Sequence, residues 1–97
     1  MKLAWSTLAV AEMRALGQYS IERWGPAVAS GYLSDVRAAA RRAAERPDRA
    51  RLLKGSLKLV RVRSHYLVVH VDAAADRLTI ARVLHGAMDL ERHLPRD

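Results

Sequence analysis

The 97-residue chain contains no cysteine and no phenylalanine, and it has only three prolines and five glycines. Without cysteine there is no disulfide framework, thiolate nucleophile or cysteine-type zinc site, which fits the reducing cytoplasm. No stretch approaches the roughly 18 consecutive apolar residues of a membrane-spanning helix, so we expect no membrane partner. The length favours one domain over residues 1–97 with one modest core and excludes a large cofactor-binding enzyme.

Motifs for nucleotides and metals are also missing. The chain has no glycine-rich phosphate loop, no dinucleotide-binding fingerprint and no serine elbow. Its histidines do not recur four residues apart, as two zinc ligands on one helix face would. We therefore expect no cofactor and no metal site from His65, His70, His85 and His93.

Acidic residues are scarce: 10 Asp and Glu face 17 Lys and Arg, which gives a net charge of +7. The excess is concentrated between residues 37 and 63, where ten basic residues accompany only Glu45 and Asp48. Such a segment can bind phosphate backbones, bind an acidic patch on another protein, or be a solvated surface. The sequence leaves these three interpretations open.

The first half of the chain predicts a strand followed by two helices. The hydroxyl of Ser6 or Thr7 can cap the first helix, whose apolar residues recur at helical spacing. Gly25 suits the break after that helix, Pro26 suits the first turn of the next one, and Pro47 ends it. The expected elements are a strand over Lys2–Trp5 and helices over about 7–23 and 26–46.

The second half changes to strand-like periodicity. Residues 48–56 are predicted to form a basic loop that turns at Gly55, and in the strand that follows, the apolar phase shifts between Leu59 and Val60, which predicts a bulge. Strands are expected over Leu57–Arg63, His65–Asp72 and Arg77–His85, with a short helix over Met88–Leu94. The fold class is therefore α+β in the order β-α-α-β-β-β(-α), a helical hairpin packed on a small, mostly antiparallel sheet.

Cationic and imidazole side chains gather in the sheet half. Metal-free cleavage of RNA needs a base, an acid and cations for the developing charge, and histidine with arginine or lysine can supply all three. The candidates for that chemistry are Lys58, Arg61, Arg82 and His85. The structural alternative is an ion pair of Arg82 with Asp89 or Glu91, and a turn held by His85.

Several short motifs spread over nearly the whole chain carry a family resemblance. The most specific are the hairpin Arg61–Val68 with its His-Tyr pair and the Arg-Val-Leu-His-x-x-Met-Asp sequence that ends at Asp89; Glu22-Arg23-Trp24-Gly25 adds to them. Together they resemble the ParE toxins of the ParE/RelE superfamily. The resemblance implies the fold above, a cytoplasmic toxin, a ParD-like antitoxin that binds it as a hetero-oligomer, and inhibition of DNA gyrase.

RelE-like relatives instead cut mRNA at the ribosome, which would require direct binding of nucleic acid. That branch often uses a C-terminal tyrosine, and no tyrosine follows Tyr66 here. The resemblance therefore favours the gyrase branch, with the ribosome-dependent ribonuclease as the alternative.

An inhibitor of this kind needs no catalytic residue, because its affinity comes from desolvated side chains and charge steering. For antitoxin binding we predict Tyr19, Trp24, Tyr32 and Val36 as apolar contacts, with Arg37 and Arg41 as partners of antitoxin carboxylates. The alternative is that the apolar members only pack one helix on the other. Possible target contacts are Arg61, Arg63, Arg82 and Met88.

Overall fold

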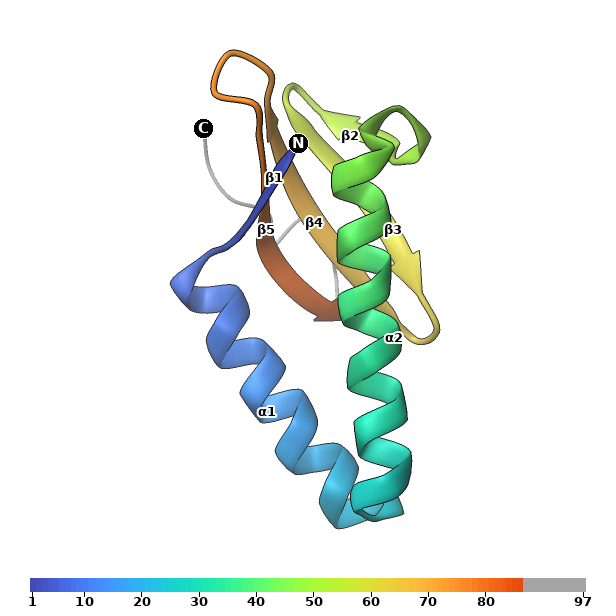
Figure 1. Ribbon diagram of the computed structural model, residues 1–97. Helices are drawn as coiled ribbons and strands as arrows, with labels where there is room; N and C mark the ends of the chain where they lie inside the picture. The colour runs from blue at the N-terminus through green and yellow to red at the C-terminus, as the bar shows by residue number, and fades with distance from the viewer. Residues whose placement is uncertain (87–97) are drawn as a thin grey trace.

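The computed structural model describes residues 1–86, which form two helices packed on one five-stranded sheet (Figure 1). The elements are β1 (Lys2–Trp5), α1 (Thr7–Trp24), α2 (Pro26–Glu45), the 3-10 turn η1 (Pro47–Arg49), β2 (Arg51–Lys54), β3 (Leu57–Val62), β4 (His65–Asp72) and β5 (Arg77–His85). The predicted α+β class and order of elements are confirmed. The predicted helix over Met88–Leu94 lies outside the described residues.

The helical hairpin is built from the local signals expected of it. The Ser6 hydroxyl accepts from the Ala9 N–H at 3.0 Å and donates to the Ala81 carbonyl at 2.8 Å, so the cap also ties α1 to β5. Gly25 has φ 87° and ψ 167°, a conformation that side chains strongly disfavour. At Gly17 an added Cβ would lie 3.2 Å from a Leu33 methyl carbon, so the two helices pack closely there.

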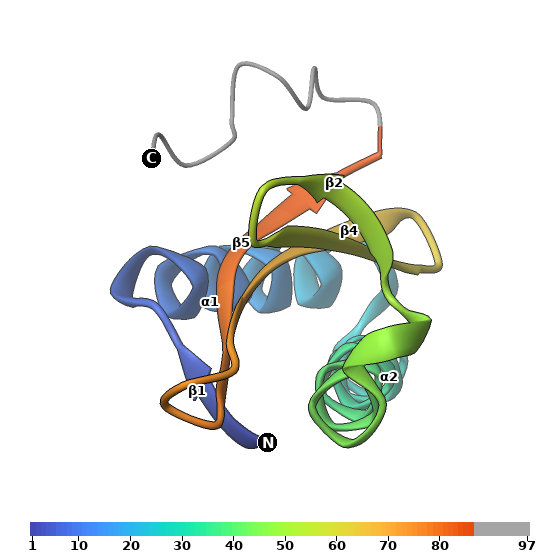
Figure 2. The same cartoon turned by 90° about the horizontal axis from the view of Figure 1, so that it is seen from above.

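The sheet has the strand order β1-β5-β4-β3-β2, with β1 parallel to β5 and the remaining neighbours antiparallel. Both helices lie on one face of it, as two perpendicular views show (Figures 1 and 2). The main core fills the space between, and its fully buried members include Val36 of α2 with Leu67, Leu78 and Ile80 of the sheet. Within residues 1–86, no further helix or strand covers the outer surfaces of the two helices.

Two expectations for the chain around β3 were wrong. Residues 51–54 form a strand rather than a loop. The burial of this strand does not alternate, since Leu52 is 66% exposed, so no strand-like pattern in the sequence predicts it. β3 pairs with β4 without a bulge. The shift in the apolar pattern of β3 between Leu59 and Val60 arises instead from burial on both faces of the sheet. Leu57 and Leu59 join a second cluster with Val68 and Leu84, whereas Val62 joins the main core, because both faces of the sheet bury apolar residues. The register shifts instead occur between Leu52 and Lys54 and opposite Val68 and Val69.

Candidate protein-binding site

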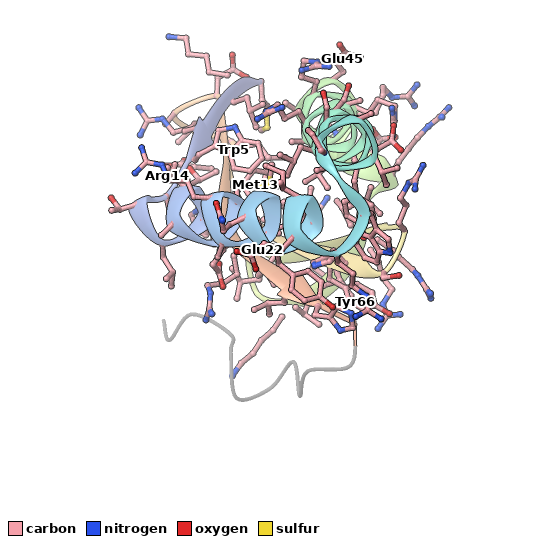
Figure 3. The ribbon with its side chains drawn as sticks, turned by 90° about the horizontal axis from the view of Figure 1, so that it is seen from below. Trp5, Met13, Arg14, Glu22, Glu45 and Tyr66 are labelled. Atoms are coloured by element: carbon pink, nitrogen blue, oxygen red, sulfur yellow. The ribbon has the colours of Figure 1, made fainter. Side chains whose placement is uncertain are left out.

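A groove of about 700 Å³ runs between α1, α2 and β1. Its walls are mainly apolar, because apolar side chains of β1, α1 and α2 face the groove. In Figure 3, Trp5, Met13 and Arg14 lie on one side of α1, whereas Tyr66 lies on the other. The apolar lining consists of Leu3, Trp5, Val10, Met13, Gly17, Ile21 and Leu33. Such a surface gains free energy when another apolar surface covers it.

The charged lining of this groove is entirely basic. Arg14 of α1 and Arg37 and Arg41 of α2 contribute guanidinium groups, and no carboxylate contributes to the lining. Within residues 1–86, none of these three arginines forms an ion pair. The groove therefore suits an amphipathic segment with an apolar stripe and flanking carboxylates.

Two of the aromatic residues predicted for antitoxin binding lie at the tip of the hairpin instead of in the groove. Tyr19 is 54% exposed and Trp24 is 49% exposed, and their rings meet edge to face with centroids 5.9 Å apart. The Arg23 guanidinium lies 5.8 Å from the centre of the Trp24 ring. Exposed Trp, Tyr and Arg are the residue types that dominate binding energy at protein interfaces.

The other two aromatic or aliphatic candidates belong to the core. Val36 is fully buried, and only a small edge of Tyr32 reaches solvent. The Tyr32 hydroxyl lies 2.6 Å from Nδ1 of His65 and accepts from the Ser64 N–H at 3.2 Å. These contacts fix the end of the β3–β4 hairpin against α2, so Tyr32 packs on the sheet, whereas the antitoxin contacts of Tyr32 and Val36 stay predictions.

His65 of β4 is a partly buried histidine whose pKa is lowered. Burial disfavours the charged ring and lowers the pKa of His65, and the neighbouring His85 lowers it further, since the two rings are 5.1 Å apart. A neutral His65 with its proton on Nε2 can accept from the Tyr32 hydroxyl through Nδ1. With a proton on Nδ1, the ring would instead donate to the Tyr32 hydroxyl oxygen, so this hydrogen bond forms in either protonation state.

Arg82 forms an ion pair with Glu12 of α1. Its guanidinium donates to the Glu12 carboxylate on α1 at 2.8–3.2 Å, and Glu12 also accepts from the Val83 N–H at 2.9 Å. Both side chains are only 18% exposed. Asp89 and Glu91, the predicted partners, lie outside the described residues.

The remaining ribonuclease candidates do not converge on one point. The Lys58 ammonium donates to the Pro47 carbonyl at 2.8 Å, close to the end of α2. The Arg61 guanidinium lies 5.7 Å from the centre of the Tyr66 ring and donates to the Arg63 carbonyl at 3.3 Å. Because Lys58 and Arg61 are three residues apart on a regular strand, they project to opposite faces of the sheet. His85 instead contacts His65.

The residues predicted as possible target contacts have different surroundings in the structure. Arg63 pairs with Asp35 of α2 at 2.8 Å and lies over the Tyr32 ring at 5.3 Å. Met88 lies outside the described residues. Of the four predicted target contacts, Arg61 is the one that is exposed and forms no ion pair within the part of the chain that the structure describes.

Sequence reasoning missed Glu12 and most of the groove. Glu12 looks like an ordinary polar residue on the solvent side of a helix, because its partners are about 70 residues away. The groove did leave a signal: Val10 and Ile21 are apolar residues of α1 outside the single stripe that the main core needs. A helix with apolar residues on more than one side has a second surface to cover.

Comparisons with known proteins agree on a family. A family model described as the ParE toxin of the type II toxin-antitoxin system, parDE, matches residues 3–90. No curated protein matches the chain. A solved structure from the "Chromosomal ParDE TA system from P. aeruginosa" has the same fold, with a TM-score of 0.76 over 88% of this chain and 95% of that chain at 14% identity. Neither helix in residues 1–86 is long and apolar enough to span a membrane.

Proposed function

The chain belongs to the ParE toxin family of type II toxin–antitoxin systems, and from that premise we propose that a ParD-like antitoxin neutralises it by binding the groove between the helices. The freed protein then acts in the cytoplasm by inhibiting DNA gyrase through protein–protein contact. The observation that carries the antitoxin proposal is an apolar groove whose charged residues are all arginines. An acidic amphipathic helix complements both properties.

The groove supports this proposal through its charge as well as its shape. Carboxylates beside Arg37 and Arg41 can form bidentate contacts, which add orientation as well as energy. Burial of the apolar lining would contribute most of the affinity, and the basic rim would speed association. Tyr19 and Trp24 are exposed and lie on α1 close in sequence to residues that line the groove, and they remain predicted contacts for the antitoxin.

The geometry of the basic residues supports inhibition by contact over RNA cleavage. Cleavage needs a base, an acid and cations arranged around one phosphate. Here Arg82 is held by Glu12, Lys58 is held by the Pro47 carbonyl, and Arg61 is on the opposite face from Lys58. Protein–protein inhibition requires none of these groups to converge.

The first test is a gyrase assay with purified, antitoxin-free protein. Supercoiling and DNA cleavage by gyrase are measured across a series of toxin concentrations. We expect inhibition of supercoiling with accumulation of cleaved DNA. Unchanged supercoiling by protein that is folded by circular dichroism would refute the gyrase proposal, and mRNA cleavage in a translating extract would then support the ribonuclease alternative.

The antitoxin proposal is tested separately. A short reading frame beside this gene should encode a protein with an acidic tail, and that protein should co-purify with this chain as a stable complex. A complex that forms equally well after the groove is blocked would contradict the assignment of the groove. The groove should be blocked with Val10→Arg, because Val10 is an exposed residue of its lining. A bulky substitution at Gly17 is unsuitable, because Leu33 already lies against that position.

A further inference from the structure

Two histidines lie side by side at one end of the sheet. His65 begins β4, His85 ends β5, and the register pairs them directly across these antiparallel strands. Side chains of directly opposed residues project from the same face of a sheet, with Cβ atoms about 4.5–5.5 Å apart. The centres of the two imidazole rings are 5.1 Å apart. Spacing along the sequence does not reveal this pair, because the sheet register, not a helix turn, brings the rings together.

The separation of the rings suits two ligands of one metal ion. With a metal–nitrogen distance of about 2.0–2.1 Å, the centre of each ring lies about 3.2 Å from the metal. Two such rings at an angle of about 90–110° therefore have centres about 4.5–5.3 Å apart, and the observed 5.1 Å falls within this range. His85 is exposed and His65 is partly exposed, so an ion can approach from solvent and the His85 ring can turn toward it.

α2 holds the His65 ring in place. The Tyr32 hydroxyl lies 2.6 Å from Nδ1 of His65 and accepts from the Ser64 N–H at 3.2 Å. When Nε2 of His65 binds a metal, the ring carries its proton on Nδ1 and donates it to the Tyr32 oxygen. Among residues 1–86, Nε2 has no hydrogen-bond partner. A hydrogen bond at the other ring nitrogen is the usual means by which proteins orient a metal-binding imidazole.

The backbone around the pair is also fixed. The Gly86 N–H, next to His85, donates to the carbonyl of Ser64, next to His65, at 2.7 Å. An added Cβ at Gly86 would lie 3.1 Å from that carbonyl oxygen, so glycine permits the close approach. The two imidazoles therefore project from strand ends that are joined to each other, and rigid elements of this kind favour a precise ligand pair.

The charge of Arg63, which lies beside this cluster, is balanced. Its guanidinium lies 5.3 Å from the centre of the Tyr32 ring and pairs with the Asp35 carboxylate at 2.8 Å. The ion pair reduces the repulsion that an uncompensated guanidinium would exert on a bound cation.

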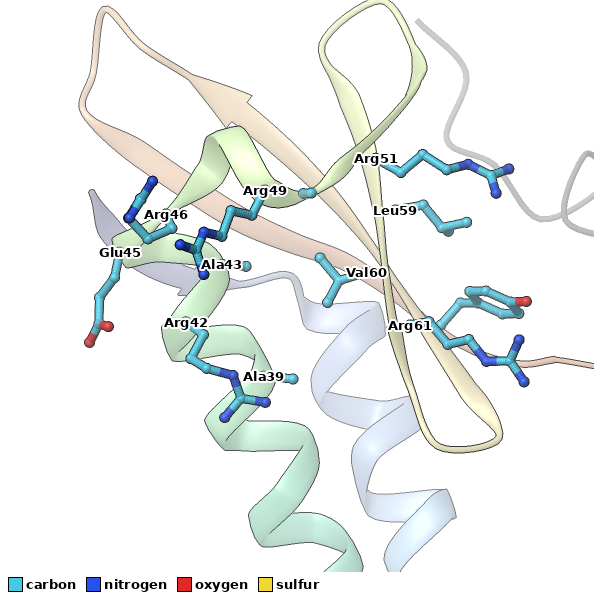
Figure 4. A pocket seen from close by; sticks show the side chains of 12 residues that line it. Ala39, Arg42, Ala43, Glu45, Arg46, Arg49, Arg51, Leu59, Val60 and Arg61 are labelled. Atoms are coloured by element: carbon cyan, nitrogen blue, oxygen red, sulfur yellow. The ribbon is translucent and has the colours of Figure 1, made fainter.

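The histidine pair is separate from two hollows in the surface. Neither histidine lines the groove between the helices. A second cavity of about 680 Å³ lies between α2, η1 and the edge of β3 that β2 leaves uncovered, and five arginines line it (Figure 4). Neither histidine lines that cavity, and its guanidiniums would repel a metal ion. The histidine pair is therefore a distinct site.

We propose that His65 and His85 together bind one divalent ion of the late first-row transition metals, with Cu²⁺ bound most tightly. Imidazole is a ligand for Cu²⁺, Ni²⁺ and Zn²⁺, and a given site generally binds Cu²⁺ more tightly than the other two. Within residues 1–86, no group of three or more His, Asp or Glu side chains is suited to holding a metal, so water completes the coordination. Mg²⁺ and Ca²⁺ prefer oxygen ligands and should not bind here.

This proposal revises the expectation of no metal site, which rested on helical spacing of the histidines. It goes beyond the function proposed above and stands without it. A bound ion would join the ends of β4 and β5 and so stabilise the folded protein.

The test is a titration of the purified full chain with Cu²⁺ in a buffer that does not bind copper. It is carried out at about pH 7.5, where ordinary imidazoles are neutral. Isothermal titration calorimetry measures the affinity, and electron paramagnetic resonance reports the nitrogen ligands. We expect a first equivalent of Cu²⁺ to bind with the resonance signature of two imidazoles, and Mg²⁺ to produce no heat of binding.

Matched variants locate the ion. His65→Gln and His85→Gln should each weaken the binding of this first equivalent at least tenfold, because one imidazole then remains. His70→Gln changes an exposed histidine elsewhere on β4 and should alter the affinity less than twofold. Circular dichroism verifies that each variant is folded. His85→Gln alters an exposed side chain, so it tests the site even if His65→Gln disturbs the contact with Tyr32.

Three results would overturn the proposal. One is the absence of Cu²⁺ binding, another is an affinity that His85→Gln leaves unchanged, and the third is equal weakening by His70→Gln and His85→Gln. Either of the last two results would assign the copper to ligands other than this pair. None of these outcomes bears on the gyrase assay or on antitoxin binding, so failure here is distinguishable from failure of the proposed function.

Discussion

The ion pair between Glu12 and Arg82 provides the sharpest test of how the helical hairpin is attached to the sheet. Its carboxylate receives N–H groups from the Arg82 guanidinium at 2.8–3.2 Å and from the Val83 backbone at 2.9 Å. Both side chains are 18% exposed, so solvent screens the pair only weakly. The contact covers part of β5 that lies beyond its pairing with β1, which ends at Ile80.

Removal of the carboxylate should therefore be costly. Breaking a buried pair by deleting one partner costs about 3–5 kcal/mol. We expect about 3 kcal/mol for Glu12→Ala, at the low end because both groups retain some exposure. For a domain of this size, that change in the free energy of unfolding corresponds to a decrease in Tm of about 12–24 °C. Glu12→Gln keeps an acceptor for the Val83 N–H and should cost only about 1 kcal/mol.

Urea unfolding followed by circular dichroism at pH 7 measures these differences. The control is Glu12→Leu/Arg82→Leu, which removes both charges and should be less destabilised than Glu12→Ala, because no desolvated guanidinium remains. A free energy of unfolding for Glu12→Ala within about 0.5 kcal/mol of the wild type, the range of ordinary surface substitutions, would refute the reasoning.

Four further predictions use the same stability assay or a binding assay. Gly25→Ala should destabilise by about 1–3 kcal/mol, because alanine is strained at φ 87° and ψ 167°; an unchanged unfolding midpoint would contradict this. Burial lowers the pKa of His65, so its ring binds a proton more readily in the unfolded chain than in the folded protein. The neutral ring therefore contributes its full share of the free energy of unfolding above about pH 6.5. That contribution is lost as the pH falls through the folded-state pKa. Urea unfolding between pH 7.5 and 5 should therefore have a steeper pH dependence in the wild type than in His65→Gln, and equal slopes would argue against His65 as the cause. Tyr32→Phe should lower the free energy of unfolding by about 1–2 kcal/mol, because it removes the hydrogen bonds to His65 and Ser64. The same unfolding curves measure this change, and an unchanged free energy would show that these hydrogen bonds do not stabilise the fold. Arg37→Glu/Arg41→Glu should weaken antitoxin binding at least tenfold by calorimetry with little effect on unfolding, and unchanged affinity would exclude the groove as the antitoxin site.

Sequence reasoning succeeded where the determining interactions are local. The cap at Ser6, the break at Gly25 and the Val- and Leu-rich run within His65–Asp72 each act over a few residues, and the structure confirms the elements that they predict. The family resemblance is confirmed, and the motifs that carry it lie near residues 61–68 and 82–89 and at the end of α1.

The expectations that failed depended on pairing between distant segments. β2 exists because residues 51–54 pair with β3, not because their own pattern favours a strand. Tyr32 and Val36 share the apolar stripe of α2 with residues that could face a partner, and only their packing against the sheet assigns them to the core. Propensity is a weak signal when tertiary contacts decide the outcome.

The sequence by itself determined the helices, most strands, the family and the basic character of residues 37–63, because periodicity, caps and charge are properties of neighbouring residues. Only the tertiary structure decided how that charge is divided. It places Arg37 and Arg41 along one apolar groove, Arg42 and Arg61 beside a free strand edge, and Arg82 against Glu12. The physical reason is that a guanidinium acquires its role from what packs around it, and those neighbours come from parts of the chain up to 70 residues away.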